Sequence, residues 1–316
     1  MRRKKVAIIG ANGFLGLAIS KELSKQGYEV IGFVRNKNAK YTSLFKSLKI
    51  KVIAVGDLEI QKKIDLLGNS FNYVINLAAR AHINKKLSNK GDDFIKKLSN
   101  IERNLVSSFD TKNVKLIQLS SAKVKLNKKN SFISDNELVY SKAKLASEKV
   151  IKNNFNKYII LRPPLIYGPN VKANFLSLIK MIDKGIPLPF KNLQNARSYL
   201  YLENLVDLII KIIKEDKFLN KYYYVSDGGY VSTKHLTDLI AKYLSKKPVY
   251  FNINSHLLEF LAKVLNKKNL LQKVVGNFKV KNNELKKDIG WEPKYNLELG
   301  VKNTCFWYKT MFKIQT

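Results

Sequence analysis

A short apolar stretch that runs into closely spaced glycines constrains this chain more than any other feature. Residues 6–9 lead directly into Gly10, Gly13 and Gly16, after which a helical pattern begins. In such a unit the first glycine makes a tight turn, the second lets a phosphate approach the backbone, and the third brings helix and strand together. The helix N-terminus would then direct free N–H groups at the anion. The run predicts a dinucleotide-binding loop, with an ordinary strand-turn-helix corner as the alternative. Its other candidate residues are Asn12, Phe14 and Leu15.

Apolar runs recur along the first half of the chain, with intervening segments long enough for helices. This alternation indicates repeated βαβ units around a parallel sheet. We therefore expect an α/β fold, a Rossmann-type doubly wound parallel sheet with a smaller, interleaved C-terminal substrate domain. The runs cover residues 6–9, 30–34, 51–55, 73–77, 115–119 and 158–161.

The rhythm changes after Arg162, where five of the seven prolines fall close together. Farther on, residues 222–225 return to a strand pattern and look like a late addition to the sheet. We predict a dinucleotide-binding domain and a substrate domain that exchange segments. The first covers residues 1–165 with a returning segment at about 197–228, and the second covers 166–196 and 229–316.

Composition limits which class of protein this chain can belong to and in which cellular compartment we expect it. With 316 residues, 45% of them hydrophobic, the chain can bury a large core. Its single cysteine, Cys305, excludes an internal disulfide, and its basic N-terminus leads into too short an apolar stretch for a signal peptide. No segment approaches the roughly 18 uninterrupted apolar residues of a membrane span. We expect a cytoplasmic protein with no transmembrane segment and no metal site.

The formal net charge of +34 allows two interpretations, a polyanion-binding surface or a solvated lysine surface. The basic residues are scattered through every segment, whereas a nucleic-acid footprint usually gathers them on one element. We therefore expect no specific nucleic-acid partner. The charge would still attract the chain loosely to an anionic membrane surface.

The end of the second apolar run bears on the choice of cofactor. In this fold an acidic residue there holds the ribose 2′-hydroxyl, whereas an arginine accommodates a 2′-phosphate. Arg35 occupies that place, and Glu29 lies at the wrong end of the run. NADP(H) is therefore favoured, with NAD(H) as the alternative. Asp57 and Leu58 follow the third run and are placed to meet the adenine edge, although a helix N-cap is the alternative for Asp57.

Tyr140 and Lys144 are four residues apart, which places them on one face of a helix. The same spacing begins at Tyr230 and Tyr243, so the pair alone decides nothing. Only Tyr140 begins a helical pattern after a strand that ends near Ser121, and ligands bind at the carboxyl ends of such strands.

The three side chains form an acid–base set. Ser121 would hydrogen-bond a substrate oxygen, and Tyr140 would exchange a proton with that oxygen. Lys144 would lower the pKa of the Tyr140 phenol by its charge and bind the nicotinamide ribose. Such a set suits hydride transfer to or from a carbinol carbon. For Ser121 alone, a turn residue is the alternative.

Together these motifs resemble the extended short-chain dehydrogenase/reductase family, the NAD-dependent epimerase/dehydratase group that acts on nucleotide sugars. The resemblance covers nearly the whole chain. It implies that Leu77, Ala78, Ala79 and Pro163 line the cofactor, beside Tyr140 and Lys144. The further segments that resemble the family are residues 76–82, 162–169, 197–205 and 289–293.

Residues 168–175 and 185–189 are similar to those of bacterial 4-ketoreductases that form UDP-N-acetyl-quinovosamine. This resemblance implies reduction of a UDP-4-keto-6-deoxy-hexosamine in surface-polysaccharide synthesis, by a homodimer. It also implies that Asn174 and Arg197 bind the nucleotide and that His82 and Ser121 face the sugar. A helix cap is the alternative for Asn174, and a surface charge is the alternative for Arg197. A UDP-sugar 4-epimerase with tightly bound NAD is the alternative activity.

Two departures from the family pattern leave a non-enzymatic alternative open. Asn76 stands where the family usually has histidine, and Leu98 lies near the place of an asparagine that supports the proton relay. A degenerate cofactor-binding scaffold is therefore a third hypothesis, against which the complete acid–base set argues. A dehydratase is not expected, because Ser121 is followed by Ala122 and Lys123 rather than by two acidic residues.

Overall fold

The computed structural model describes residues 3–36, 39–61, 63–78, 91–125, 135–252 and 276–312. Its main feature is a seven-stranded sheet with the order β3-β2-β1-β4-β5-β6-β9, in which every neighbouring pair is parallel. This order confirms the predicted α/β, Rossmann-type fold. The strands are β1 (Lys5–Ile9), β2 (Glu29–Val34), β3 (Lys51–Ala54), β4 (Tyr73–Asn76), β5 (Lys115–Leu119), β6 (Lys157–Arg162) and β9 (Lys221–Tyr224).

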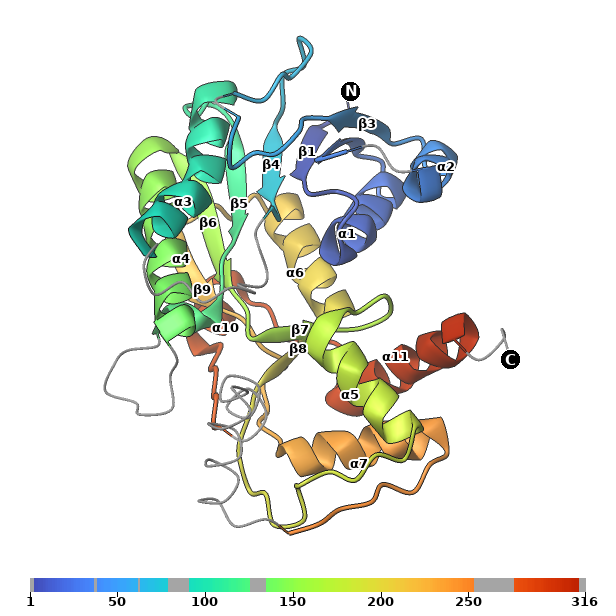
Figure 1. The fold of residues 1–316 in the computed structure, drawn as a ribbon. Coiled ribbons are helices and arrows are strands. Elements are labelled where there is room, and N and C mark those ends of the chain that lie inside the picture. The colour runs from blue at the N-terminus through green and yellow to red at the C-terminus, as the bar shows by residue number, and fades with distance from the viewer. Residues whose placement is uncertain are drawn as a thin grey trace.

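Helices cover both faces of the sheet because alternate strand residues point to opposite sides. In β1, Val6 and Ile8 belong to one buried apolar cluster, whereas Ala7 and Ile9 belong to another. Figure 1 shows α1 and α6 on one side of the sheet and α3 and α4 on the other. The helices of this part are α1 (Phe14–Lys25), α2 (Ala39–Ser47), α3 (Gly91–Ser108), α4 (Asp135–Asn154), α6 (Leu202–Lys214) and α10 (Asn283–Ile289), with the short 3-10 helix η1 (Ala122–Lys125).

A second group of elements lies beyond the carboxyl ends of the central strands (Figure 1). It contains a two-stranded parallel sheet, β7 (Leu165–Tyr167) and β8 (Tyr199–Tyr201), with α5 (Ala173–Asp183), α7 (Thr233–Leu244) and α11 (Leu297–Phe312). These elements share a third apolar cluster, at whose centre Tyr167 stacks on Phe175 with ring centroids 5.1 Å apart. Gly300 of α11 passes so close to Tyr167 that a Cβ would overlap the phenol.

Chain order and spatial order differ in the later segments. β9 pairs with β6 as the edge strand of the large sheet, and α6 packs beside α1. The strand expected at residues 222–225 is therefore present. The predicted division into a domain at 1–165 and a substrate domain stays a prediction. Within the described ranges, none of the helices has both the length and the apolar character that a membrane span requires.

Candidate active site

The turn between β1 and α1 is built almost entirely from backbone. Gly10 has a φ of +82°, a conformation that favours glycine, and its N–H donates to the carbonyl of Phe33 at 2.8 Å. A Cβ on Gly13 would lie 3.1 Å from the Gly10 carbonyl oxygen, and one on Gly16 would overlap the backbone of both Gly10 and Ala11. The glycines therefore serve the turn and the close helix contact that the sequence predicts.

The same turn presents the positive end of a helix. Gly13 is the N-cap of α1, no side chain among the described residues caps it, and no acidic residue stands in the first turn. The first N–H groups of α1 thus stay available for an anion. Along this loop Asn12, Phe14 and Leu15 are half-buried, with Phe14 packed against the apolar core.

Two strand ends meet beside the glycine turn. The Leu77 N–H, just beyond β4, donates to the Ile9 carbonyl at 3.1 Å, and Gly10 lies against the backbone of Ala78. Leu77 and Ala78 are therefore placed along the predicted cofactor edge. Ala79 and His82 lie outside the described residues.

Arg35 and Asp57 follow neighbouring strands and form a loose ion pair. Nη2 of Arg35 is 3.6 Å from Oδ2 of Asp57, and the Arg35 side chain is 58% exposed. Oδ1 of Asp57 accepts from the Glu59 N–H at 3.0 Å, so Asp57 also organises the turn after β3, in which Leu58 is buried. The guanidinium of Arg35, which the sequence assigns to a 2′-phosphate, is thus already paired with the carboxylate of Asp57.

The serine of the predicted acid–base set lies where β5 and β6 end. Ser121 lies two residues beyond the end of β5, and its Oγ accepts from the Lys123 N–H at 3.2 Å. The next N–H, that of Ala122, donates to the Pro163 carbonyl at 2.8 Å, which ties this segment to the end of β6. Pro163 is therefore a neighbour of the serine turn.

Helix α4 brings the other two acid–base residues to this turn. Tyr140 is half-buried, and Lys144, one helical turn later, is 2% exposed. Next to Tyr140, in the second turn of α4, the Ser141 hydroxyl donates to the Val124 carbonyl at 3.2 Å, which fixes α4 against η1. The three predicted side chains thus come from adjacent segments at the carboxyl side of the sheet.

A buried ion pair that sequence reasoning missed supports this corner. Nη2 of Arg162 lies 2.5 Å from Glu148 Oε2, and the Ser120 hydroxyl donates to Oε1 of the same carboxylate at 2.6 Å. The guanidinium also stacks over the Tyr222 ring at 3.6 Å. The pair joins β6, α4 and the residue before Ser121. The sequence feature that could have indicated this pair is the charged residue Arg162 at the end of the apolar run 158–161.

A second buried polar cluster, also missed, lies behind the site. Asn76, at the end of β4, donates to Gln118 Oε1 at 2.9 Å and to Glu102 Oε1 at 3.4 Å, while its own Oδ1 accepts from the Ala78 N–H. Gln118 donates to the same Glu102 oxygen at 3.0 Å. Desolvation by burial raises the pKa of Glu102, against a lowering effect of the Lys144 charge.

The predicted nucleotide-binding residues lie in the second group of elements. Asn174 is half-buried in the first turn of α5, whose N-cap is Lys172, so the helix-cap alternative is wrong. Arg197 is mostly buried, its Nη1 donates to the Gly276 carbonyl, and its backbone pairs with Val231. Burial lowers the pKa of Arg197, which Tyr199 and Glu137 of α4 partly offset. Arg197 is therefore not an ordinary surface charge.

Asp227 organises the turn after β9. Its carboxylate accepts from the Tyr201 N–H at 2.9 Å and from Asn204 Nδ2 at 2.7 Å. Desolvation nevertheless prevails and raises the pKa of Asp227 to about 6. Asp227 fixes β8 and α6 relative to β9 and belongs to the scaffold of the site.

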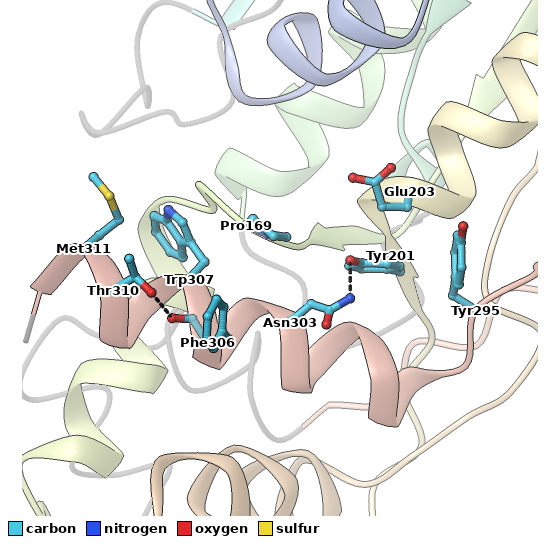
Figure 2. Close-up of a pocket in the computed structure, with 9 residues that line it drawn as sticks. All are labelled: Pro169, Tyr201, Glu203, Tyr295, Asn303, Phe306, Trp307, Thr310 and Met311. Atoms are coloured by element: carbon cyan, nitrogen blue, oxygen red, sulfur yellow. Dashed lines mark hydrogen bonds between the residues drawn. The ribbon is translucent and has the colours of Figure 1, made fainter.

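A groove of about 530 Å³ lies elsewhere, along α11 (Figure 2). Figure 2 shows Glu203 and Tyr201 on one side and Trp307 and Phe306 of α11 on the other. Asn303 donates to the Tyr201 hydroxyl across it at 3.2 Å. No predicted site residue is among those lining the groove.

Comparison with known proteins adds to this geometry. A model of the NAD dependent epimerase/dehydratase family matches residues 6–225. The UDP-glucose 4-epimerase of Vibrio cholerae is 30% identical over 318 residues, which cover 96% of this chain and 94% of that protein.

Solved structures share the fold. The UDP-glucuronic acid 4-epimerase of Bacillus cereus, in complex with NAD, superposes with a TM-score of 0.72 at 18% identity and covers 98% of this chain and 99% of that one. The UDP-glucose 4-epimerase of Thermotoga maritima, with UDP-glucose, gives 0.69 at 19% identity and covers 97% and 99%.

Proposed function

The chain belongs to the NAD-dependent epimerase/dehydratase family, and from that premise we propose that it is a nucleotide-sugar oxidoreductase. In this proposal it transfers a hydride at C4 of a UDP-4-keto-6-deoxy-hexosamine and acts as a 4-ketoreductase in surface-polysaccharide synthesis. The observation that supports the proposal is that helix α4, which carries Tyr140 and Lys144, packs against η1, the short helix that begins directly after Ser121 beyond the end of β5.

The glycine turn fits a dinucleotide, because a Cβ at Gly16 would collide with the backbone that forms it and the N-terminus of α1 is uncapped by side chains. Gly10, Gly13 and the first N–H groups of α1 would hold the pyrophosphate. Leu77, Ala78 and Pro163 would line the nicotinamide side, and Leu58 the adenine side. When bound, the cofactor supplies the hydride that reduces a C4 ketone.

The protein's own part is to handle the proton and the developing charge. As C4 accepts the hydride, the carbonyl electron pair moves to O4, and the Tyr140 hydroxyl delivers a proton to that oxygen. Ser121 donates a hydrogen bond to the same oxygen, and the ammonium of Lys144 stabilises the phenolate that Tyr140 becomes. Solvent then returns a proton to Tyr140.

We assign the nucleotide to the second group of elements. Asn174 and Arg197 are both partly buried. A guanidinium that is shielded from water is suited to bidentate hydrogen bonding with a diphosphate. His82 would complete the sugar side. The proposal includes a homodimer, which multi-angle light scattering of the purified protein tests.

A 4-epimerase is the second candidate, favoured by the 30% identity to a UDP-glucose 4-epimerase. The same three side chains would remove a proton from O4 during oxidation and return it after the ketone turns over. A reductase consumes added nicotinamide cofactor, whereas an epimerase copurifies with it and needs none.

The test uses purified protein and UDP-4-keto-6-deoxy-N-acetylglucosamine, with NADH and NADPH supplied separately. We expect the nicotinamide absorbance to fall in proportion to the product formed. Interconversion of UDP-glucose and UDP-galactose without added cofactor would instead identify the epimerase. Tight cofactor binding with neither reaction would indicate the non-enzymatic scaffold.

A further inference from the structure

An ion pair joins the segment that follows Ser121 to helix α4. Nζ of Lys123 lies 2.7 Å from Oε1 of Glu137, and the two side chains are 33% and 13% exposed. Lys123 belongs to η1, and Glu137 lies in the first turn of α4. Water and salt screen a partly buried pair less than an exposed one, so this pair can hold its two segments together.

One end of the ion pair is tied to the serine of the acid–base set. The Lys123 N–H donates to the Ser121 Oγ at 3.2 Å, so the residue that carries the ammonium also holds the serine oxygen. Because that oxygen accepts this bond, the hydroxyl proton is left for a substrate oxygen. A shift of Lys123 would therefore move the group that Ser121 offers to the substrate.

The other end of the ion pair lies on the tyrosine side of the site. Glu137 precedes Tyr140 by three residues on α4, and side chains three apart on a helix are neighbours. The ion pair thus connects the segment of Ser121 with the helix turn that carries Tyr140.

A second link between the same two elements lies on the other side of Tyr140. The hydroxyl of Ser141, which is 3% exposed, donates to the Val124 carbonyl at 3.2 Å. Glu137 and Ser141 are four residues apart, so they share the face of α4 that meets η1. One link would let α4 turn about it, whereas two links fix both the separation and the orientation. Tyr140 lies between them in the sequence.

We propose that Lys123 and Glu137 are positioning residues, whose ion pair sets where the Ser121 hydroxyl lies relative to the Tyr140 phenol. The inference deepens the proposed function and rests on it, because there both groups must meet the same substrate oxygen. Neither charged side chain has to touch the substrate. Misplacement of a reacting group by about 1 Å costs roughly 10²-fold in rate, so loss of the pair should appear mainly in kcat.

Hydrogen exchange tests the link without any cofactor or substrate. In Glu137→Gln, the backbone amides of residues 122–125 should exchange several-fold faster, because η1 is then held to α4 by one link fewer. The matched control is Asp288→Asn, which breaks the ion pair of Lys221 and Asp288 at 2.9 Å between β9 and α10. That variant should leave the same amides unchanged. Unchanged exchange in Glu137→Gln would overturn the proposal.

Charge reversal tests the link in the reaction. Lys123→Glu and Glu137→Lys each place two like charges together, and each should lower kcat by about 10- to 100-fold. The KM for NADH should change only a few-fold, because the glycine turn is a separate part of the site. The double reversal restores the attraction and should recover most of kcat. Full kcat in the single variants, or no recovery in the double variant, would refute the role.

A Ser121→Ala background separates positioning from a merely structural role. In that background no serine hydroxyl remains to be placed, so Glu137→Gln should lower kcat by less than about three-fold more. If Glu137→Gln costs as much there as in the unmodified protein, the ion pair supports the fold in general and does not position Ser121. The mild Glu137→Gln change also serves if a reversed variant does not fold.

The two proposals fail in different ways. If no sugar nucleotide is turned over but the amides of residues 122–125 exchange faster in Glu137→Gln, the proposed function is wrong and the link between η1 and α4 stands. If turnover occurs and Glu137→Gln keeps both the exchange rates and kcat of the unmodified protein, the function stands and the positioning role is wrong.

Discussion

The candidate site has two parts, which differ in whether backbone or side chains form them. The cofactor end, between β1 and α1, is formed by backbone, because the positions that matter there are glycines. The chemical end, around Ser121 and Tyr140, depends on side chains, and buried hydrogen bonds join its neighbouring elements α3, α4, β5 and β6. Geometry is fixed at the first end by steric exclusion and at the second by charge and hydrogen bonding. The two ends should therefore fail differently when they are altered.

Tyr140→Phe should have the largest effect and should act on the chemical end alone. Removal of the proton donor should reduce kcat by about 10²- to 10⁴-fold. Cofactor affinity should stay within a few-fold, because the ring remains in place. Steady-state kinetics and fluorescence titration with NADH measure the two quantities. Equal turnover in the variant would remove Tyr140 from the mechanism.

Gly16→Ala should damage the cofactor end through packing. The new methyl group would collide with the backbone of Gly10 and Ala11, so we expect a loss of about 2 to 3 kcal/mol in the free energy of unfolding, together with weakened cofactor binding. Gly229→Ala is the matched control, since its Cβ would meet nothing within 4 Å. Urea denaturation measures the free energy of unfolding of both variants. Equal values for Gly16→Ala and Gly229→Ala would show that the turn has room for a Cβ at residue 16.

Asp227→Asn should change how stability depends on pH. Folding raises the pKa of Asp227 to about 6 from its ordinary 3.8, so the folded state binds the extra proton between these values. The contribution of this group is fully present below pH 4 and is lost as the pH rises through 6. We expect it to amount to about 2 to 3 kcal/mol.

The measurement compares the unmodified protein with Asp227→Asn at pH 4 and pH 8, so that the large net charge affects both alike. The free energy of unfolding of the unmodified protein, relative to that of the variant, should be larger at pH 4 than at pH 8. A constant difference between the two would mean that Asp227 ionises as it does in the unfolded chain.

Arg35→Ala should have the smallest effect and concerns the choice of cofactor. The family is NAD-dependent and the Bacillus cereus neighbour was solved with NAD, so the predicted preference for NADP(H) is not confirmed. An exposed arginine shared with Asp57 should contribute about 1 kcal/mol to binding of a 2′-phosphate.

Loss of Arg35 should therefore weaken NADPH roughly five-fold more than NADH. Asp57→Asn should do the reverse, because it releases the guanidinium from its carboxylate. Calorimetric titration of both cofactors provides the ratio. If the ratio is the same in all three proteins, Arg35 does not meet the 2′-phosphate.

The difference between the two ends also explains what the sequence could predict. The glycine spacing and the recurring apolar runs are local patterns, and they were enough to predict the parallel sheet and the turn of Gly10. The same patterns predicted a strand that ends near Ser121 and a helix that carries Tyr140 and Lys144, although that helix begins at Asp135 and not at Tyr140; the catalytic roles of these residues stay a prediction.

The supports of the chemical end could not be predicted, because their partners are distant in the sequence. Asn76 bonds Gln118 across two strands, and Glu148 meets Arg162 only after α4 has folded back on β6. No periodicity marks such pairs. Asp57 shows a different limit, since its side chain serves both a turn and an ion pair with Arg35.

The most direct test of the account is hydride transfer itself. NADH or NADPH carrying deuterium at the transferred position of C4 is incubated with UDP-4-keto-6-deoxy-N-acetylglucosamine and the protein, and the product is analysed by mass spectrometry and NMR. We predict one deuterium at C4 of the sugar with the unmodified protein and almost none formed by Tyr140→Phe. A product without deuterium, or equal labelling by the two proteins, would contradict the account.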